Sequence, residues 1–504
     1  MFGDFVHESA ARGVSTAVGT PLANYPVSAR RSLHTSILNA EITLKKTVDL
    51  SFKAVRHAYA NGLRPHDIIS RAANTISLAA KTNAWIHAES LNRLLAQCDV
   101  LEQHRASGEV LPLFGIPFGV KDNIDVANMP TTAACPGFTY TPDRSARSVQ
   151  LLVEAGAICM GKTNLDQFAT GLSGARSAYG TCGSVGNPLY VSGGSSSGSA
   201  VAVAACHVSF ALGTDTGGSG RIPAGFNGIV GIKPTVGRVS TRGLVPNCRS
   251  LDCVSIFAAS VAEGMDVLRS IDGFDPDDAY CKIPPVNSVT SQPKAVCQFS
   301  FGRLKKPDLQ CFGMDECGRL YEEACDRIAG IGGQPVEIDF APFLAAGKLL
   351  FDGPWIAERR SALEPFASSN PDALLDVTRR VLDVADKFSA VQAFDGMSQL
   401  ASLKRAVEKQ FSSISVLVVP TAPRPFTIED MDRNPIELNN KLGYYSYFAN
   451  LLELCGIAVP NGMLSCGVPM GVTFLAPAWA DERLGVVASQ FETETKRIPN
   501  RVSA

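Results

Sequence analysis

The stretch that decides the fold reads GGSSSGSAVAVAACHVSFALGTDTGGSGR and spans residues 193–221. It opens with a Gly/Ser loop, and the uncharged run that follows, residues 199–206, is typical of a buried helix. Residues 210–212 are apolar and predict a short strand. A second Gly-rich turn, residues 215–221, closes the stretch. We therefore predict a loop, a helix, a strand and a turn in succession, as in an α/β protein.

The segments on either side repeat this alternation. Residues 157–160 and 416–419 are short apolar runs and are predicted to be buried strands. Helical patterns are predicted over residues 42–101 and 315–410, whereas residues 266–307 are predicted to form a loop-rich connection. The alternation favours an α/β sandwich around a largely buried sheet, built as one large domain.

Composition and charge narrow the possible functions. The 504 residues carry a formal net charge of −2, and 45% are hydrophobic and 19% charged, which is an ordinary globular balance. A nucleic-acid binder usually carries a basic stripe, so we expect no nucleic-acid partner. The apolar run nearest to a membrane span, residues 200–212, is shorter than the roughly 18 residues needed, so we expect no membrane association.

Cysteine usage and the N-terminal segment indicate a compartment. The 14 cysteines are scattered, without a C-x-x-C pair or a Cys/His cluster at zinc spacing, so no metal site is predicted. Free thiols, together with an N-terminus that lacks the signal-peptide pattern, favour the reducing cytoplasm. Residues 1–40 are rich in Ser and Ala, and we predict an N-terminal arm that is either flexible or wrapped around the other protomer of a dimer.

One short motif matches a phosphate-binding loop. Gly156, Gly161, Lys162 and Thr163 fit G-x-x-x-x-G-K-[ST], which is typical of nucleotide hydrolases. That loop follows a strand and needs a bendable segment whose N–H groups surround the phosphates. Here the four intervening residues, 157–160, are apolar and are themselves the predicted strand. The nucleotide-binding interpretation is therefore disfavoured.

A second motif matches the nucleophile elbow of α/β-hydrolases. Residues 194–198 fit G-x-S-x-G, with Ser196 as the nucleophile. Such an enzyme needs a histidine well downstream of the serine. Only His207 follows Ser196, and it comes so soon that it falls within the helix that the elbow would begin. A Ser–Asp–His triad would therefore lack its base, and this interpretation is also disfavoured.

A third interpretation uses both Gly/Ser turns together with a lysine. The segment of residues 119–123, GVKDN, places Lys121 at a predicted strand end, and the two turns supply Ser195 and Ser219. Taken singly, Gly/Ser loops are usually plain turns and lysines are usually solvated. The combination of all three in one chain indicates a catalytic site.

These segments resemble the amidase signature family, densely over residues 111–259 and more loosely over residues 45–490. The resemblance implies an α/β fold, with an α/β/α sandwich around a large mixed β-sheet. It also implies a homodimer, a small-molecule amide substrate and no metal or organic cofactor. We expect an amidase domain over residues 41–490 and a C-terminal tail over residues 491–504, without a separate C-terminal decarboxylating domain.

The resemblance assigns roles to particular residues. The family's lysine, bridging serine and nucleophile match Lys121, Ser195 and Ser219, in the family's order and spacing. It implies a cis peptide bond before Ser195. The oxyanion hole would consist of backbone N–H groups, from Thr216, Gly217, Gly218 and Ser219.

Within that family the chain is similar to the allophanate hydrolases. The shared runs are TTAACP at 131–136, NLDQFATGL at 164–172, RSLDCVS at 249–255 and GPWIAER at 353–359. In that group the arginine that ends the last run binds the substrate carboxylate, which implies the same role for Arg359, since a guanidinium matches a carboxylate bidentately. The group typically has a tyrosine that touches the substrate where this chain has Phe351.

The resemblance implies a mechanism as well. Ser219 would attack the amide carbonyl and pass its proton through Ser195 to Lys121, which is a base only when neutral. Because burial disfavours the charged amine, we predict a lowered pKa for Lys121. Asp215 and Arg221 flank the turn and are predicted to hold it in shape rather than to take part in the chemistry.

The predicted activity is hydrolysis of allophanate to ammonia and N-carboxycarbamate, as in urea degradation. Two alternatives remain open. One is a different amidase, acting on biuret or a short carboxylate amide, for which Phe351 is the discriminating residue. The other is a protein similar to the glutaminase-like component of a transfer RNA amidotransferase complex, which would act together with partner proteins.

Overall fold

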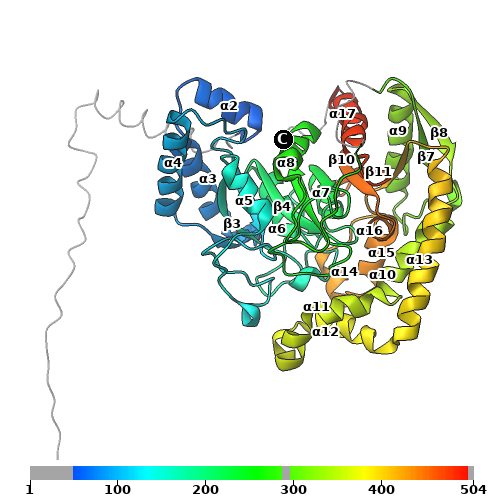
Figure 1. Ribbon diagram of the computed structural model, residues 1–504. Helices are drawn as coiled ribbons and strands as arrows, with labels where there is room; N and C mark the ends of the chain where they lie inside the picture. Colours follow the sequence, from blue (N-terminus) through cyan, green and yellow to red (C-terminus); the bar gives the residue numbers. More distant parts are fainter. Residues whose placement is uncertain (1–48, 287–295, 498–504) are drawn as a thin grey trace, which may run out of the picture. The chain divides into compact units, whose positions relative to one another are not determined.

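A large mixed sheet is the framework of the protein. The computed structural model describes residues 49–286 and 296–497, and 11 strands within them form one sheet (Figure 1). The strands follow one another across the sheet in the order β1 (Trp85–Ala88), β3 (Ile158–Thr163), β2 (Pro117–Lys121), β4 (Phe210–Asp215), β6 (Cys253–Ala258), β5 (Val230–Lys233), β10 (Cys455–Met463), β11 (Pro469–Ala476), β9 (Val416–Pro420), β7 (Phe299–Arg303) and β8 (Gly333–Glu337).

Strand directions vary across the sheet. β2 pairs in parallel with both β3 and β4, and β7 pairs in parallel with both β8 and β9. The strands between β4 and β9 are antiparallel to their neighbours, and β1 is antiparallel to β3 at the edge. The prediction of a large mixed sheet is confirmed.

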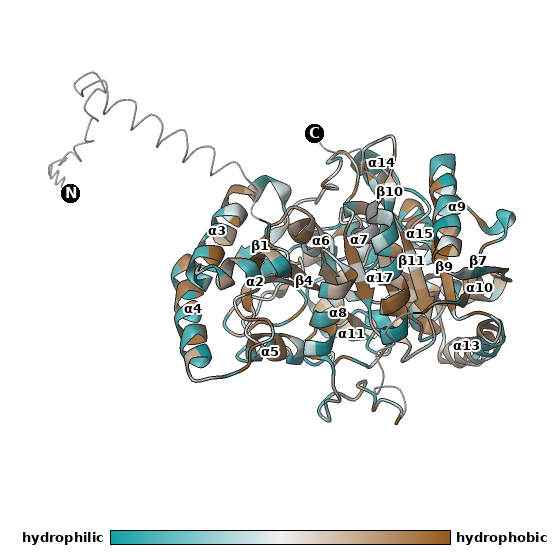
Figure 2. Cartoon of the chain, turned by 90° about the horizontal axis from the view of Figure 1, so that it is seen from above, coloured by the Kyte–Doolittle hydropathy of each residue, from teal (hydrophilic) through white to brown (hydrophobic). Residues whose placement is uncertain are grey.

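The helices are α2 (Phe52–Ala60), α3 (Pro65–Leu78), α4 (Leu91–Ala106), α5 (Arg147–Glu154), α6 (Ser197–Ala204), α7 (Ile222–Asn227), α8 (Val261–Ile271), α9 (Asp315–Gly330), α10 (Ala341–Phe351), α11 (Trp355–Ser369), α12 (Asp376–Leu382), α13 (Ala390–Phe411), α14 (Ile428–Arg433), α15 (Glu437–Leu442), α16 (Phe448–Leu451) and α17 (Asp481–Arg497). α6 and α7 pack on one face of the sheet, and α5, α8 and α17 lie on the other (Figure 2). The predicted α/β/α sandwich is confirmed.

Helices on both faces explain the apolar strands. β2, β3, β4, β6, β9 and β11 are buried along their whole length. Strands covered on both sides carry continuous apolar runs instead of alternating polar and apolar residues. β3 continues to Thr163, so Gly161 and Lys162 of the phosphate-loop motif lie inside a strand, where they cannot surround a phosphate.

Several segments differ from the sequence predictions. β1 lies inside residues 42–101, and β8 lies inside residues 315–410, although both segments were predicted to be helical. The end of α8 and the whole of β7 lie inside residues 266–307, which were predicted to be loops. β1, β7 and β8 pair with strands far from them in the sequence, and local residue pattern carries little information about such pairing.

The sequence also predicted two boundaries, the end of the amidase domain and the N-terminal arm. The predicted end of the amidase domain at residue 490 falls within α17. The predicted N-terminal arm, residues 1–40, lies outside the described residues.

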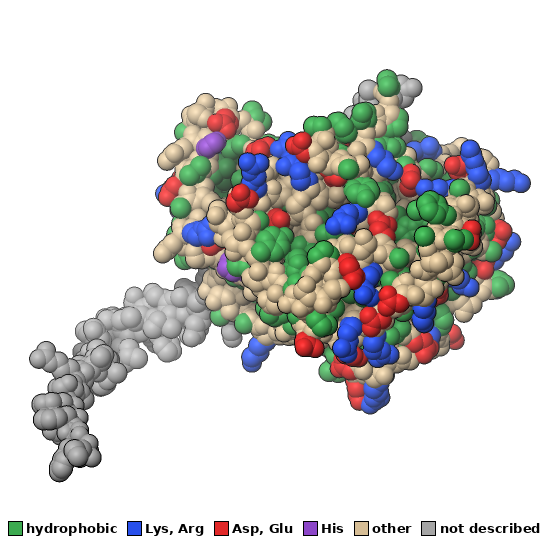
Figure 3. Space-filling view, turned by 60° about the horizontal axis from the view of Figure 1, so that its bottom comes forward, with side chains coloured by type: hydrophobic (Ala, Val, Ile, Leu, Met, Phe, Trp, Pro, Cys, Tyr) green, Lys and Arg blue, Asp and Glu red, His purple; other side chains and the backbone are tan. Residues whose placement is uncertain are grey.

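The surface carries both signs of charge. On the face seen in Figure 3, acidic and basic side chains are interspersed among apolar ones.

None of the helices in the described part of the chain combines the length and the apolar composition that a bilayer span needs.

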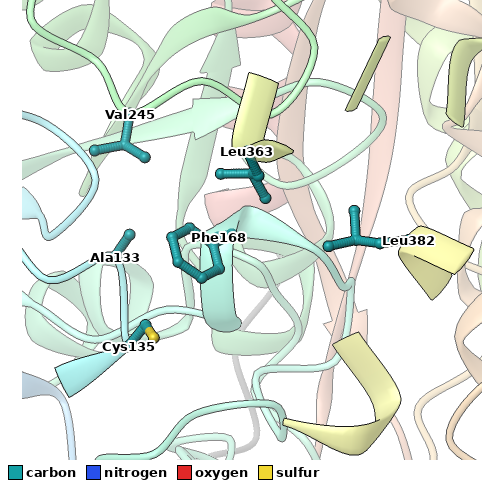
Figure 4. Close-up of a cluster of buried hydrophobic side chains, with 6 residues drawn as sticks. All are labelled: Ala133, Cys135, Phe168, Val245, Leu363 and Leu382. Atoms are coloured by element: carbon teal, nitrogen blue, oxygen red, sulfur yellow. The ribbon is translucent and has the colours of Figure 1, made fainter. Parts of the chain in front are cut away.

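An apolar cluster packs α11 and α12 against the loops that contain the shared sequence runs at 131–136, 164–172 and 249–255. Leu363 of α11 and Leu382 of α12 pack with four buried side chains from those loops (Figure 4), namely Ala133, Cys135, Phe168 and Val245. Phe366, also on α11, meets Phe138 edge-on, with 5.0 Å between ring centroids. The cluster therefore fixes the position of the helix that carries Arg359.

We predict that Leu363→Ala lowers the free energy of unfolding by about 2–5 kcal/mol, because Leu363 is 3% exposed and its removal leaves a cavity. The matched control is Leu78→Ala at a leucine that is 77% exposed, for which we expect a change within about 0.5 kcal/mol. Urea unfolding followed by circular dichroism measures both. Equal effects of the two substitutions would contradict the role of the cluster.

Candidate active site

Lys121 and the turn that carries Ser219 lie at the carboxyl ends of two adjacent strands. Lys121 ends β2, and Asp215, which begins the turn that carries Ser219, ends β4. Because β2 and β4 are parallel neighbours, their carboxyl ends meet at the same edge of the sheet. The loop with Ser195 comes directly before α6, which packs on both strands. Lys121 and Ser195 are fully buried, and Ser219 is 4% exposed.

α6 lies unusually close to the neighbouring loops because its first turn contains a glycine. A Cβ atom on Gly198 would lie 2.3 Å from the carbonyl oxygen of Ala84 and 2.4 Å from the backbone nitrogen of Asn164. Any side chain here would therefore push backbone away. The glycine thus allows the start of α6, and with it Ser195, to sit deep in the protein.

The Lys121 amine is held by two hydroxyl groups. Its Nζ atom donates to Ser195 Oγ and to Thr214 Oγ1, each at 2.7 Å. Among the described residues, no carboxylate lies within ion-pair distance of this amine. Lys162 on the adjacent strand is different, since its Nζ lies 3.0 Å from Asp122 Oδ1. A buried lysine without an ion pair is suited to act as a base.

Burial lowers the pKa of Lys121 to about 7, although the more distant carboxylates of Asp166, Asp252 and Asp215 oppose this shift. The dominant cause is the loss of hydration of the charged amine. The prediction of a lowered pKa is confirmed.

The loop that carries Ser195 is held by a network of backbone hydrogen bonds. The peptide bond between Gly194 and Ser195 is cis, as the resemblance implies. The Ser195 carbonyl accepts a hydrogen bond of 3.0 Å from the N–H of Asp166. The Asp166 carboxylate in turn accepts from backbone N–H groups further along its own loop, those of Ser173, Gly174 and Arg176.

The turn that carries Ser219 is built around one carboxylate. Asp215 accepts from the N–H groups of Gly218 and Gly220, at 2.8 and 3.0 Å. It also accepts two hydrogen bonds of 2.9 Å from the Arg221 guanidinium. Burial alone would raise the pKa of Asp215, but the charge and hydrogen bonds of Arg221, together with the Lys233 charge and the N–H of Gly218, outweigh this and the pKa is lowered. The prediction that Asp215 and Arg221 hold the turn is confirmed.

These contacts change the expected set of oxyanion donors. The N–H of Gly218 was predicted to be an oxyanion donor, but it already donates to the Asp215 carboxylate. In the described part of the chain, no hydrogen bond occupies the N–H of Thr216, Gly217 or Ser219. The hydroxyls of Ser195 and Ser219 were also expected to be linked. In this structure they are not hydrogen-bonded to each other. The role of the three remaining donors stays a prediction.

Arg359 is a buried cation with free hydrogen-bonding groups. It lies on α11 and is 2% exposed, and its Nε and Nη1 atoms are buried without a partner among the described residues. Its guanidinium carbon lies 4.6 Å from the centre of the Phe351 ring, which offers a π-face but no hydrogen bond. A buried charge without an acceptor is costly. The side chain is therefore suited to receive an anionic ligand.

Three residues near the site were not found from the sequence. Thr214 shares the Lys121 amine with Ser195. Asp252 accepts from the Thr216 hydroxyl and from the N–H groups of residues 247 and 248, and burial raises its pKa to about 6. Tyr447 packs on Phe351 with ring centroids 4.3 Å apart. Thr214 precedes the Gly-rich turn and Asp252 lies in a motif run, but nothing in the sequence indicates Tyr447.

One group of side chains elsewhere offers ligand atoms for a metal ion. His66, Asp99 and Glu102 have ligand atoms within 4.8 Å of one another, on the surface of α3 and α4. His66 Nε2 already lies 2.9 Å from Asp99, and Arg64 binds Glu102 through two nitrogen atoms. The group is therefore an ordinary exposed cluster of ion pairs.

Comparison with known proteins identifies the family. The protein-family model described as Amidase matches residues 67–484. The chain belongs to the amidase family. Urea amidolyase of Saccharomyces cerevisiae is 39% identical over 417 residues, which cover 82% of this chain and 22% of that protein. The chain therefore spans well under two thirds of the length of this relative.

Two further relatives of this amidase-family chain differ in function. One component of the glutamyl-tRNA(Gln) amidotransferase of Synechococcus sp. is 32% identical, with 91% of this chain and 99% of that protein covered. The structure of Kluyveromyces lactis allophanate hydrolase matches with a TM-score of 0.83 at 36% identity, covering 91% of this chain and 74% of that one. The predicted resemblance to the amidase signature family and to allophanate hydrolases is confirmed.

We predict that Asp215→Asn lowers the free energy of unfolding by about 3–5 kcal/mol at neutral pH, because it leaves Arg221 buried without its counter-charge. The pKa of Asp215 is below its usual value, so this stabilisation is present at neutral pH and is lost only as the pH falls through that lowered pKa. The control is Glu323→Gln, which removes an exposed pair with Arg319 and should cost less than about 1 kcal/mol. Denaturant unfolding of both variants is the measurement, and a loss at Asp215 no larger than the control would contradict this assignment.

Proposed function

We propose that this amidase-family chain hydrolyses a small amide through Ser219, Ser195 and Lys121, and that the amide is allophanate. The observation that carries the proposal is the Lys121 amine, which is fully buried, has a pKa lowered to about 7 and lies 2.7 Å from Ser195 Oγ. A neutral amine in this position can accept a proton at physiological pH. The products would be ammonia and N-carboxycarbamate.

The proposed reaction has two halves. Ser219 Oγ bonds to the amide carbonyl carbon, and its proton moves by way of Ser195 to Lys121. The N–H groups of Thr216, Gly217 and Ser219 would stabilise the oxyanion. When the C–N bond breaks, the proton on Lys121 goes to the leaving nitrogen and ammonia departs. Water then attacks the acyl-enzyme by the same proton route and releases the acid.

In this proposal the relay closes when substrate binds. The Lys121–Ser195 hydrogen bond is already made, whereas the hydroxyls of Ser195 and Ser219 are not hydrogen-bonded to each other. Catalytic hydrogen bonds are often long or absent without substrate and shorten in the complex. Base, nucleophile and N–H donors all come from the chain, so this chemistry needs no metal or organic cofactor.

Arg359 is the proposed partner of the substrate carboxylate. Its Nε and Nη1 atoms are buried without an acceptor, and a carboxylate bound bidentately would accept from one of them together with Nη2. The neighbouring Arg176 adds positive potential, and its own pKa is lowered by burial and further by Arg359. The similarity to the Kluyveromyces lactis allophanate hydrolase supports allophanate among such carboxylate amides. We also propose a homodimer, from the family resemblance, and a cytoplasmic location, from the scattered cysteines, with residues 41–490 as the amidase domain.

A second candidate is the glutamine-hydrolysing component of an amidotransferase complex. The supporting observation is the similarity to the glutamyl-tRNA(Gln) amidotransferase component of Synechococcus sp., which extends over 99% of that protein. Glutamine carries an α-ammonium group next to its carboxylate. The two buried guanidinium groups of Arg359 and Arg176 disfavour that extra positive charge, and so favour allophanate.

We expect purified protein to release ammonia from allophanate and Ser219→Ala to abolish this release. Because Lys121 must be neutral, kcat/KM should fall about tenfold per pH unit below a pKa of about 7 and level off above it. The control is Ser196→Ala, which removes the nucleophile of the elbow motif and should leave the enzyme active. A coupled ammonia assay over pH 5–9 tests this. Activity that survives in Ser219→Ala would refute the proposed nucleophile, and release from glutamine alone would favour the second candidate.

We also expect Arg359→Lys to raise KM for allophanate by about tenfold or more, because lysine keeps the charge but loses the bidentate geometry. Its matched control is Arg360→Lys on the next position of α11, where the side chain pairs with Glu364. Steady-state kinetics of both variants provide the comparison. An unchanged KM in Arg359→Lys would remove this residue from the binding site.

A further inference from the structure

A column of side chains connects Arg359 to the nucleophile turn. The Arg359 guanidinium carbon lies 4.6 Å from the centre of the Phe351 ring. The Phe351 and Tyr447 rings follow, with centroids 4.3 Å apart and planes inclined by 41°. Tyr447 then reaches the turn, since a Cβ atom on Gly217 would lie 3.2 Å from Tyr447 Cδ1. Side-chain contacts therefore run without a break from Arg359 through the two aromatic rings to the nucleophile turn.

The column is fixed at its Tyr447 end. The Tyr447 hydroxyl donates to the Asn439 carbonyl oxygen and accepts from Asn439 Nδ2, both at 3.2 Å. The Asn439 side chain also accepts a hydrogen bond of 2.7 Å from the N–H of Leu172, in the loop that carries one of the motif runs. Because the phenol oxygen is already engaged, Tyr447 offers the site its ring surface and not a hydrogen bond.

A cavity lies directly beside the same two rings. It has a volume of about 460 Å³ between α10 and the segment that follows α15, and its lining includes Leu344, Gly347, Gly443 and Tyr444 together with Phe351 and Tyr447. Lys121, Ser195, Ser219 and Arg359, in contrast, are at most 4% exposed. Phe351 and Tyr447 are thus the residues common to the cavity and to the buried site.

We propose that the Phe351–Tyr447 pair is a specificity filter, which separates the nucleophile turn from this cavity and restricts the enzyme to short carboxylate amides. This inference rests on the proposed function, because it assumes a carboxylate on Arg359 and a carbonyl at Ser219. Phe351 has no polar atom and the Tyr447 hydroxyl is occupied, so the pair discriminates by shape alone. For substrates that differ by one methylene, a hydrophobic wall of this kind changes kcat/KM by about 10- to 200-fold.

The test compares malonamate, succinamate and glutaramate, whose carboxylate and amide are separated by successively more methylenes. In wild-type protein we expect kcat/KM to fall along this series. In Phe351→Ala, and in the milder Phe351→Leu should the first variant fold poorly, we expect the ratio of kcat/KM for glutaramate over malonamate to rise about tenfold or more. An unchanged ratio in a folded variant would overturn the filter.

Two matched controls separate the filter from a general effect. Tyr447→Phe keeps the ring and removes the hydroxyl, so it should leave the ratio unchanged. Tyr444→Ala enlarges the same cavity at a residue whose ring contacts Phe312, Phe340 and Tyr445 and not Phe351, and it should also leave the ratio unchanged. A change of ratio in Tyr444→Ala equal to that in Phe351→Ala would contradict the assignment to the stacked pair.

A binding measurement keeps the filter testable if the proposed function fails. Thermal shifts of Ser219→Ala, with and without Phe351→Ala, are measured with malonate, succinate and glutarate. Here the filter predicts a change in preference toward the longer diacid when Phe351 is truncated. Absence of ammonia release from every amide would refute the proposed function, whereas an unchanged diacid preference would refute the filter.

Discussion

The lysine amine at the end of β2 is the constraint on which the rest of the site depends. Lys121 is fully buried, and its amine rests on the hydroxyls of Ser195 and Thr214 without a carboxylate beside it. Keeping a charged amine there is costly, so the protein holds its pKa near 7. A carboxylate at the distance that Asp122 has from Lys162 would favour the charged form. The arrangement of the surrounding loops can be understood as supplying hydroxyls to this amine while keeping acidic groups at a distance.

Three buried carboxylates hold those loops without touching the amine. Asp215 gathers two N–H groups and Arg221 in the turn of Ser219, Asp166 gathers three N–H groups beside Ser195, and Asp252 binds the Thr216 hydroxyl. Buried carboxylates need such donors, because an ionised group without them is unstable in the interior. Each therefore fixes one loop and, from a distance, also opposes the lowering of the Lys121 pKa. Arg359 departs from this rule, since two of its nitrogen atoms have no acceptor within the described residues. That imbalance is what a bound carboxylate would remove.

Relatives with this fold act in different settings, so the fold alone does not select the substrate. Urea amidolyase and the component of glutamyl-tRNA(Gln) amidotransferase are both more than 30% identical to this chain. In the proposed function, the side chains that distinguish substrates lie around the nucleophile turn and come from α10, α11 and the segment after α15. In this chain they are a buried guanidinium and two stacked aromatic rings. In the proposed function, charge selects a carboxylate amide and ring packing limits its length.

The sequence by itself determined the parts of this protein that are encoded locally. The run at residues 193–221 predicted α6, β4 and both Gly-rich turns, because small residues, apolar runs and glycines act over a few positions. Buried strands such as β9 were also predicted correctly, from their short apolar runs. Only the tertiary structure decided how remote segments meet. It paired β1, β7 and β8, assigned the N–H of Gly218 to Asp215, and placed Tyr447 against Phe351. Those contacts depend on packing between residues far apart in the chain, and no local pattern of residue types records which of them will be neighbours.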